Sequence, residues 1–276
     1  MKHAAALNLV ASDWDGTLAD TFEKSPNGVG VEPCYRMALR DMFGSNALLD
    51  DIGGLQNRAS AEVIAAVLEL DAPLARRGCQ YAEKQADDLK HLVPPGKGIA
   101  DGANIADVLT ETLVRVRLRY LLPEIDGRWP KPYEGVLEFL ETLERQGKCI
   151  AIITAGHDMF VQKTFHVWGV KCPKFIVTDD DLRSLKVPHK DKYKPSGYLW
   201  QVLDQRIRAV SGLPEHVPRK ARLYVGDCPQ RDRGLAWNGN VRFAWFNPER
   251  KATPMGFGNN EFQFTSWKQA RNQLLY

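Results

Sequence analysis

Two aspartates one residue apart, close behind an apolar run, constrain this chain more than any other feature. Residues 7–11 are mostly apolar and predict a buried strand, and the chain soon continues as Asp13-Trp14-Asp15-Gly16-Thr17-Leu18. Both carboxylates therefore emerge at the carboxyl end of the strand, the edge at which open α/β sheets bind ligands. Side chains at i and i+2 of an extended segment lean to the same side, but the turn that Gly16 permits can splay them around one small ligand. One carboxylate can then attack while the other carries a proton.

Further polar groups lie beside predicted elements in a fixed order along the chain. They are Thr154 after the apolar run 149–153, Lys194 before a predicted helix at about 196–210, and Asp227 and Asp232 after the run 222–225. A hydroxyl and free backbone amides at 154–156 suit phosphate oxygens. The ends of four predicted strands and helices would thus supply an acid, a hydroxyl, a lysine and a second acid.

With these motifs in this order, the chain resembles the haloacid dehalogenase superfamily, a large group of mostly phosphate-transferring enzymes. The resemblance covers residues 5–19 and 130–250. The roles that it implies are nucleophile for Asp13, which forms an aspartyl-phosphate, general acid and base for Asp15, phosphoryl binding for Thr154 and Lys194, and Mg²⁺ binding for Asp13, Asp227 and the backbone carbonyl of Asp15. Asp232 either contacts the metal as well or orients its loop.

The chemistry of phosphate transfer explains why these residue types are needed. A carboxylate that attacks a phosphate dianion meets like-charge repulsion, so a divalent cation and a lysine must neutralise the approach. Mg²⁺ takes oxygen ligands and is usually held by one or two carboxylates, which Asp13 and Asp227 would supply. Asp15 must donate a proton to the leaving oxygen near neutral pH, which needs a pKa raised by burial or by neighbouring acids.

Each residue also has a structural alternative. An Asp followed by Gly is commonly a turn, and Thr154 alone suits a helix cap. Lys194 alone would be a solvated surface charge, and Lys190 or Lys192 could take its place in the motif. The occurrence of all the motifs together, in order, favours the functional interpretation.

The acid at position 15 narrows the chemistry. By the resemblance, ion-pumping relatives carry Thr at this position and true dehalogenases lack the acid, so Asp15 favours phosphate-ester hydrolysis or mutase chemistry over carbon–halogen cleavage. Cys228 follows Asp227 where relatives often have Ser or Thr. We interpret Cys228 as a small packing residue and not as a thiol nucleophile.

The chain between Leu18 and the second apolar strand is far longer than one crossover helix needs. Turn clusters occur at 25–28 and 94–98, and apolar spacing predicts helices at 34–43, 59–70 and 105–120. We therefore expect an α/β fold, with a Rossmann-like parallel sheet and helices on both faces, from residues 1–19 and 128–276. Residues 20–127 would form an α-helical cap domain, entered and left through linkers.

Shorter elements are expected in the rest of the core. The predictions are a helix at 159–168, strands at 175–178, 241–246 and 262–264, and a final helix ending at 275. The interval between Thr154 and Lys194 leaves no room for a second large cap. A lid over the acids would exclude bulk water and disfavour large polymeric substrates.

Composition agrees with this class of protein. The 276 residues are 44% hydrophobic and 26% charged, as in a soluble globular protein of one or two domains. Five cysteines without a CxxC pair indicate neither zinc nor a disulfide framework, so we expect a cytoplasmic protein. The N-terminal stretch resembles a short secretion signal, but Asn8 interrupts it and cleavage there would remove the strand before Asp13. No apolar run approaches the roughly 18 residues of a membrane span.

Charge is distributed unevenly. Residues 20–127 hold 12 Lys or Arg against 17 Asp or Glu, a balance of −5, and the remainder holds 25 against 17, or +8. This asymmetry suits a core that attracts phosphate and a cap that docks by charge complementarity. Chance drift of surface charge is an equal alternative.

Arg58 is the candidate in the cap for contacting the far end of the substrate. The alternative is that Arg58 caps a helix or forms a salt bridge. Arg115, Arg117 and Arg119 do not share one helix face, and we expect them to be mostly solvated.

The favoured hypothesis is a Mg²⁺-dependent phosphatase that hydrolyses a small phosphorylated metabolite through an aspartyl-phosphate, without a membrane partner. A phosphomutase on the same core is one alternative, and a non-catalytic phosphate-binding regulatory protein is another. A third is a phosphatase for nucleic-acid ends, prompted by the basic run Lys186, His189, Lys190, Lys192 and Lys194. The acidic cap opposes a bound polyanion, which makes a nucleic-acid partner the weaker hypothesis.

Overall fold

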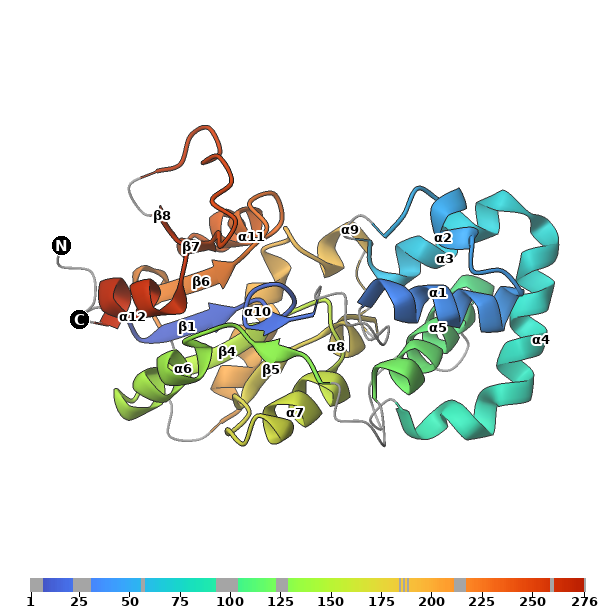
Figure 1. Cartoon of the computed structure of the whole chain (residues 1–276), viewed down its shortest axis with the longest axis horizontal. Helices are drawn as coiled ribbons and strands as arrows, with labels where there is room; N and C mark the ends of the chain where they lie inside the picture. The colour runs from blue at the N-terminus through green and yellow to red at the C-terminus, as the bar shows by residue number, and fades with distance from the viewer. Residues whose placement is uncertain are drawn as a thin grey trace. The chain divides into compact units, whose positions relative to one another are not determined.

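The computed structural model of the chain describes residues 7–21, 31–55, 58–92, 104–122, 129–183, 185, 187, 189–210, 217–258 and 261–275 (Figure 1). The predicted turn clusters at 25–28 and 94–98, and Lys186, lie outside the described residues. Contacts divide the chain into two compact units. The first, here the sheet unit, comprises Met1–Asp20, Pro130–Thr178 and Leu185–Tyr276, and the second, here the helical unit, comprises Thr21–Trp129 and Asp179–Ser184.

The sheet unit contains a six-stranded parallel sheet with the strand order β5-β4-β1-β6-β7-β8. Its strands are β1 (Leu9–Ser12), β4 (Cys149–Ile153), β5 (Phe175–Val177), β6 (Arg222–Gly226), β7 (Arg242–Phe246) and β8 (Glu261–Phe264). From β1 the chain builds β4 and β5 on one side and then crosses to β6, β7 and β8 on the other. The boundary between β1 and β6 is therefore a switch point of the topology, where such sheets bind ligands at the carboxyl ends of the strands.

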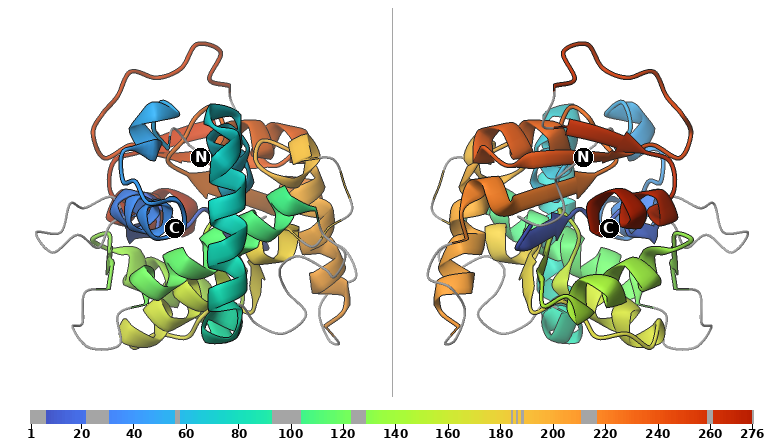
Figure 2. Two further views of the ribbon diagram at one scale, coloured as in Figure 1. Left: turned by 90° about the vertical axis from the view of Figure 1, so that its right-hand side faces the viewer. Right: turned by 90° about the vertical axis from the view of Figure 1, so that its left-hand side faces the viewer.

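Helices cover both faces of the sheet, which confirms the predicted α/β fold. They are α6 (Val136–Arg145), α7 (Asp158–Val167), α9 (His189–Lys192), α10 (Tyr198–Arg208), α11 (Asp232–Gly239) and α12 (Trp267–Leu275). Alternate strand residues such as Val10 and Leu223 pack in one core with α6, α7 and α12. Tyr224 contacts Trp200 of α10 on the opposite face, and Figure 2 shows α6 and α10 on the two sides of the strands. Because both faces are covered, β1, β4 and β5 are nearly continuous apolar runs, which is why the sequence reveals them.

The helical unit consists of helices packed around α5. Its elements are α1 (Val31–Phe43), α2 (Leu48–Asp51), α3 (Ser60–Leu70), α4 (Ala72–Leu89), the 3₁₀ turn η2 (Lys90–Leu92), α5 (Ile105–Leu121) and α8 (Asp179–Arg183). Helices α1, α3 and α4 all contact α5. The three predicted helices are present with ends shifted by a few residues, but α4 was not predicted. It buries only Gly78 and Leu89, so no stripe of large apolar residues marks it in the sequence.

The expectation that the arginines of α5 are mostly solvated is wrong for Arg117, whereas Arg119 is exposed. Arg117 is buried, with its guanidinium carbon 3.5 Å from the centre of the Tyr35 ring, and it donates a hydrogen bond to Ser60 Oγ at 2.9 Å. The other two form ion pairs, Arg115 with Glu111 and Arg119 with Asp41. An aromatic face and a hydroxyl on neighbouring helices replace the water around Arg117, and the pattern within α5 does not reveal those neighbours.

The two ends of the chain that enter and leave the helical unit pair with each other. β2 (Ala19–Asp20) runs antiparallel to β3 (Lys131–Pro132), the region predicted as a linker. Between Thr154 and Lys194, the described residues form α7, β5 and the short helices α8 and α9. The domain boundaries 1–19 with 128–276, and 20–127, remain a proposal, and the contact division adds Asp179–Ser184 to the helical unit. None of the described helices combines the length and the apolar character needed to span a bilayer.

Close packing at Gly78 predicts the stability of the helical unit. A Cβ atom at Gly78 would lie 2.7 Å from Phe43 Cε1 and 2.8 Å from Leu109 Cδ2. Alanine is a better helix former than glycine by about 1 kcal/mol, but overpacking costs about 1–3 kcal/mol. We therefore expect Gly78→Ala to lower the free energy of unfolding, measured by urea denaturation. Gln80→Ala, at an exposed position of α4, should change it by less than about 0.5 kcal/mol, and a stabilised Gly78→Ala protein would contradict the packing.

Candidate active site

The predicted site residues lie at the carboxyl ends of adjacent strands. Asp13 follows β1, Thr154 follows β4, and Asp227 follows β6. The strands are in register, because Ser12 pairs with Ile152 on one side and Val225 on the other. The backbone amide of Asp13 donates to Val225 O at 2.8 Å, which extends the β1–β6 pairing to Asp13 itself.

Lys194 joins two of the carboxylates. Its Nζ lies 2.7 Å from Asp13 Oδ2 and 2.8 Å from Asp232 Oδ1, and its side chain is only 6% exposed. The other oxygen of Asp13, Oδ1, accepts the backbone N–H of Trp14 at 2.8 Å. Both oxygens of Asp13 are thus held, which fixes the plane of its carboxylate. Lys194 is thus the cation that the fold brings to this position.

Three carboxylates gather around one point. Asp13, Asp227 and Asp232 each offer an oxygen, and these oxygens lie within 4.8 Å of one another. Asp227 Oδ1 also accepts a hydrogen bond from the Thr17 hydroxyl at 3.2 Å. The donor set fits a hard divalent cation, which prefers carboxylate oxygens. The predicted convergence of Asp13 and Asp227 is therefore present.

The pKa values of the cluster reflect burial first and neighbouring negative charge second. Burial raises the pKa of Asp13 to about 8, with Lys194 opposing and Asp232 and Asp227 adding to the rise. Burial and the neighbouring Asp232 raise the pKa of Asp227 to about 6. Burial alone would lower the pKa of Lys194, but Asp13 and Asp232 raise it. One lysine does not balance three acids, and a bound cation would restore the charge balance.

Asp232 is engaged by protein groups at both of its oxygens. Oδ2 accepts the backbone N–H of Cys228 at 2.9 Å, and Oδ1 accepts the bond from Lys194 and lies 3.4 Å from the Tyr224 hydroxyl. Asp232 is fully buried. These contacts favour the loop-orienting alternative for Asp232, although one of its oxygens lies within reach of the cluster.

Thr154 and Asp15 face each other across the site. Thr154 Oγ1 accepts the backbone N–H of Gly156 at 2.9 Å and lies 3.5 Å from Asp15 Oδ2. Gly16 has a φ of 71°, a left-handed conformation that glycine adopts without strain, and its amide donates to Ala19 O at 3.0 Å. The predicted turn after Asp15 is present and directs the second acid toward Thr154.

Two polar contacts of the site were not predicted. The Thr17 hydroxyl binds Asp227, and the Tyr224 hydroxyl bonds to Ile153 O at 3.1 Å as well as approaching Asp232. Thr17 belongs to the first motif, so its position could have suggested a role. Tyr224 lies within an apolar strand, where only the alternation of faces would have indicated that it points to the layer containing α11.

Arg58 lies in the helical unit. Its Nη1 donates to Ile52 O at 2.7 Å, at the carboxyl end of α2. This contact agrees with the alternative that Arg58 caps a helix. The substrate contact of Arg58 remains a prediction.

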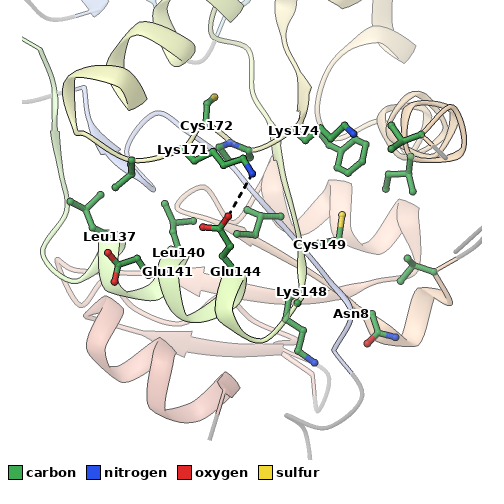
Figure 3. A pocket seen from close by; sticks show the side chains of 18 residues that line it. Asn8, Leu137, Leu140, Glu141, Glu144, Lys148, Cys149, Lys171, Cys172 and Lys174 are labelled. Atoms are coloured by element: carbon green, nitrogen blue, oxygen red, sulfur yellow. Dashed lines mark ion pairs between the residues drawn. The ribbon is translucent and has the colours of Figure 1, made fainter. Parts of the chain in front are cut away.

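A cavity of about 640 Å³ lies elsewhere in the sheet unit (Figure 3). Asn8, Cys149 and Phe175 line it, which places it at the amino ends of β1, β4 and β5, the opposite edge from Asp13. Burial raises the pKa of Cys149 to about 11, so this thiol is neutral at physiological pH. The cavity contains none of the predicted site residues, and the convergence of charged groups, not cavity volume, locates the candidate active site.

Comparison with known proteins gives matches in structure alone. No protein-family model matches the chain, and no curated protein matches its sequence. CbbY from Rhodobacter sphaeroides in complex with phosphate matches at 17% identity over 95% of both chains, with a TM-score of 0.54. A 2-haloacid dehalogenase from Pseudomonas syringae pv. Tomato DC3000 matches at 20% identity over 96% of this chain and 97% of that chain, with a TM-score of 0.50.

A third solved structure is also similar to this chain. A predicted phosphoglycolate phosphatase from Haemophilus somnus 129PT matches at 19% identity over 88% of this chain and 86% of that chain, with a TM-score of 0.50. At these identities the likeness concerns the fold, which extends over nearly the whole chain.

The charge of the cluster predicts how stability depends on pH. The folded pKa values of Asp13 and Asp227 exceed the unfolded value near 4, so between about pH 4 and pH 8 these two groups bind more protons in the folded state than in the unfolded state. Without a divalent cation, the free energy of unfolding should therefore fall as pH rises through this window. We expect a higher melting temperature at pH 5 than at pH 8.5 in the presence of a chelator.

Substitution of Asp13 should remove much of this dependence. Asp13→Asn takes one negative charge from the cluster, so the variant should melt at a higher temperature than the unsubstituted protein at pH 8.5 and show a flatter slope between pH 6 and pH 8. The control is Asp87→Asn, because the Asp87 side chain is 96% exposed. An equal slope in Asp13→Asn and the parent would contradict the assignment of the excess charge.

Proposed function

We propose that this chain, which has the fold of the haloacid dehalogenase superfamily, is a Mg²⁺-dependent phosphatase for small phosphomonoesters. The observation that carries the proposal is the Asp13 carboxylate, held at 2.7 Å from Lys194 beside Asp227. A carboxylate fixed beside a lysine and a second acid, at the carboxyl edge of a parallel sheet, suits attack on a phosphate.

The first half of the reaction breaks the ester. Asp13 attacks phosphorus, the bond between phosphorus and the ester oxygen breaks, and Asp15 gives its proton to the leaving oxygen. The product alcohol departs and the phosphoryl group stays on Asp13 as an acyl phosphate. Lys194 and the Thr154 hydroxyl would hold the phosphoryl oxygens while their charge grows.

The second half restores the enzyme. Asp15, now a carboxylate, takes a proton from water, the water oxygen attacks phosphorus, and the bond to Asp13 breaks. Inorganic phosphate leaves and Asp15 is again protonated. Bound Mg²⁺ would neutralise charge between Asp13 and the phosphate dianion, and Asp13, Asp227 and the backbone carbonyl of Asp15 would hold it, with Asp232 fixing Lys194.

The presence of Asp15 supports phosphate chemistry over carbon–halogen cleavage. One protein of similar fold is a 2-haloacid dehalogenase, and another is CbbY in complex with phosphate. Ester hydrolysis needs a proton donor for the leaving oxygen, whereas a departing halide needs none. Asp15, directed toward Thr154, could serve as that donor.

The helical unit would be the cap that selects the leaving group, with Arg58 as its candidate contact. A small phosphorylated metabolite would be the substrate, because a lid excludes water and large polymers. All five cysteines are free, and a cytoplasmic location is part of the proposal.

Replacing the nucleophile should abolish turnover. We expect Asp13→Asn to lower kcat for an aryl phosphate by at least about 10³-fold, since no acyl phosphate can form. A chelator should have a similar effect on the parent protein, and added Mg²⁺ should reverse it. Colorimetric release of the aryl alcohol measures both.

The matched control, Asp87→Asn, should retain full activity. Equal turnover by Asp13→Asn and the parent would refute the nucleophile assignment. Incubation with sugar phosphates separates the phosphomutase alternative, because isomerised ester with little free phosphate would rule against hydrolysis. Phosphate binding without turnover would favour the regulatory alternative.

Replacing the acid–base residue should trap the covalent intermediate. With an aryl phosphate, whose leaving group departs without a proton, Asp15→Asn should still transfer the phosphoryl group to Asp13. Hydrolysis of the acyl phosphate should then be slow, because the base that activates water is missing. Mass spectrometry of the intact protein should show one added phosphoryl group, lost under alkaline conditions, and its absence would argue against the role of Asp15.

A further inference from the structure

Helix α11 contacts the turn that carries Lys194. The turn consists of Lys194, Pro195, Ser196 and Gly197, and it leads directly into α10. At the beginning of α11, Asp232 Oδ1 lies 2.8 Å from Lys194 Nζ. This contact holds only the end of a long side chain, so the backbone of the turn needs another anchor.

Asn238, near the end of the same helix, supplies that anchor. Its Nδ2 donates to Pro195 O at 2.7 Å. A Cβ atom at Gly197 would lie 2.8 Å from Asn238 O, so the backbone of the turn runs directly against that of α11. At Gly234, which lies between Asp232 and Asn238 in α11, a Cβ atom would lie 2.6 Å from Pro195 Cβ. The turn is therefore in close contact with the helix from Gly234 to Asn238, over about one helical turn.

The start of α10 is fixed against the same helix. The indole N–H of Trp200 donates to Leu235 O at 3.1 Å, and a Cβ atom at Gly239 would overlap the Trp200 ring. Helix α11 thus locates the chain on both sides of Ser196. Among these contacts, the hydrogen bond from the Asn238 side chain joins α11 to the backbone carbonyl of Pro195, the residue after Lys194.

The position of Lys194 matters because its Nζ must stay on Asp13. The distance to Asp13 Oδ2 is 2.7 Å, and a misplacement of about 1 Å in a catalytic group can cost about 10²-fold in rate. Asn238 is exposed and lines a cavity of about 430 Å³ together with Ser196 and Gly197. Its replacement therefore leaves the hydrophobic core intact.

We propose that Asn238 is a positioning residue, whose amide holds the Pro195 carbonyl and thereby keeps the Lys194 ammonium on the Asp13 carboxylate. The inference rests on the proposed function for its effect on rate, because Lys194 would neutralise the developing charge on the phosphoryl group. Its effect on the environment of Lys194 is independent of any activity.

The test uses the full chain with Asn238→Ala and Asn238→Asp. The second variant keeps the shape of the side chain and loses the donor, so it remains informative if the first is poorly folded. The control is Gln201→Ala, an exposed residue that lines the same cavity. Reductive methylation followed by peptide mass spectrometry measures the reactivity of Lys194, and aryl phosphate turnover measures kcat and KM.

We expect Lys194 to be methylated several times faster in both Asn238 variants, while the control matches the parent. We also expect kcat to fall about tenfold or more, with KM within about twofold and an unchanged melting temperature. Unchanged Lys194 reactivity would overturn the inference even if the protein is a phosphatase. Faster methylation with unchanged kcat would overturn the positioning role. A parent protein without phosphatase activity would refute the proposed function, and the methylation rates would still decide whether Asn238 holds Lys194.

Discussion

The ion pair between Lys194 and Asp13 is the interaction on which the candidate active site depends. A buried carboxylate is costly unless it is paired and hydrogen-bonded, and Asp13 receives Lys194 on one oxygen and the Trp14 amide on the other. Three parts of the fold converge to make this possible: the end of β1, the turn before α10 and the first residue of α11. Because Lys194 also pairs with Asp232, the end of β1 and the start of α11 are linked through one ammonium group.

A second buried arrangement of charges organises the helical unit. Arg183 of α8 is 2% exposed and binds Asp179, Asp180 at 2.8 Å and Glu111 of α5 at 3.1 Å. Removing one member of such a set would leave a buried charge uncompensated. The set attaches residues 179–183, which follow β5 directly, to α5 within the helical unit. This explains why the contact division departs from the boundaries expected from sequence.

The parts of the fold that sequence predicts are those with a strong local signal. Strand β4 is a continuous apolar run, β6 is apolar after Arg222, and α5 repeats apolar residues at helical spacing, so each is recognisable alone. Helix α4 and the buried Arg117 depend on partners distant in sequence, Phe43 and Leu109 for the helix and Tyr35 for the arginine. In the site, Asp13 and Lys194 follow from motifs, but the bonds of Tyr224 and Asn238 arise only from tertiary packing and have no motif.

The bonds of Asp232 bear on which carboxylates remain for a cation. Oδ1 accepts Lys194 and Oδ2 accepts the Cys228 amide, so binding a metal through Asp232 would require the loss or sharing of one of these bonds. Asp227 accepts one hydroxyl, from Thr17, and its pKa is raised to about 6 chiefly by burial. Asp13 also accepts a bond at each oxygen, but its side chain is 14% exposed, whereas that of Asp232 is fully buried. Under the proposed function, Asp13 and Asp227 would be the two protein carboxylates on Mg²⁺, in keeping with the small number of carboxylates that this ion usually takes. Asp232 would then act through Lys194. Helix α11 would thus hold this lysine at two points, through Asp232 at its first residue and through Asn238 near its end.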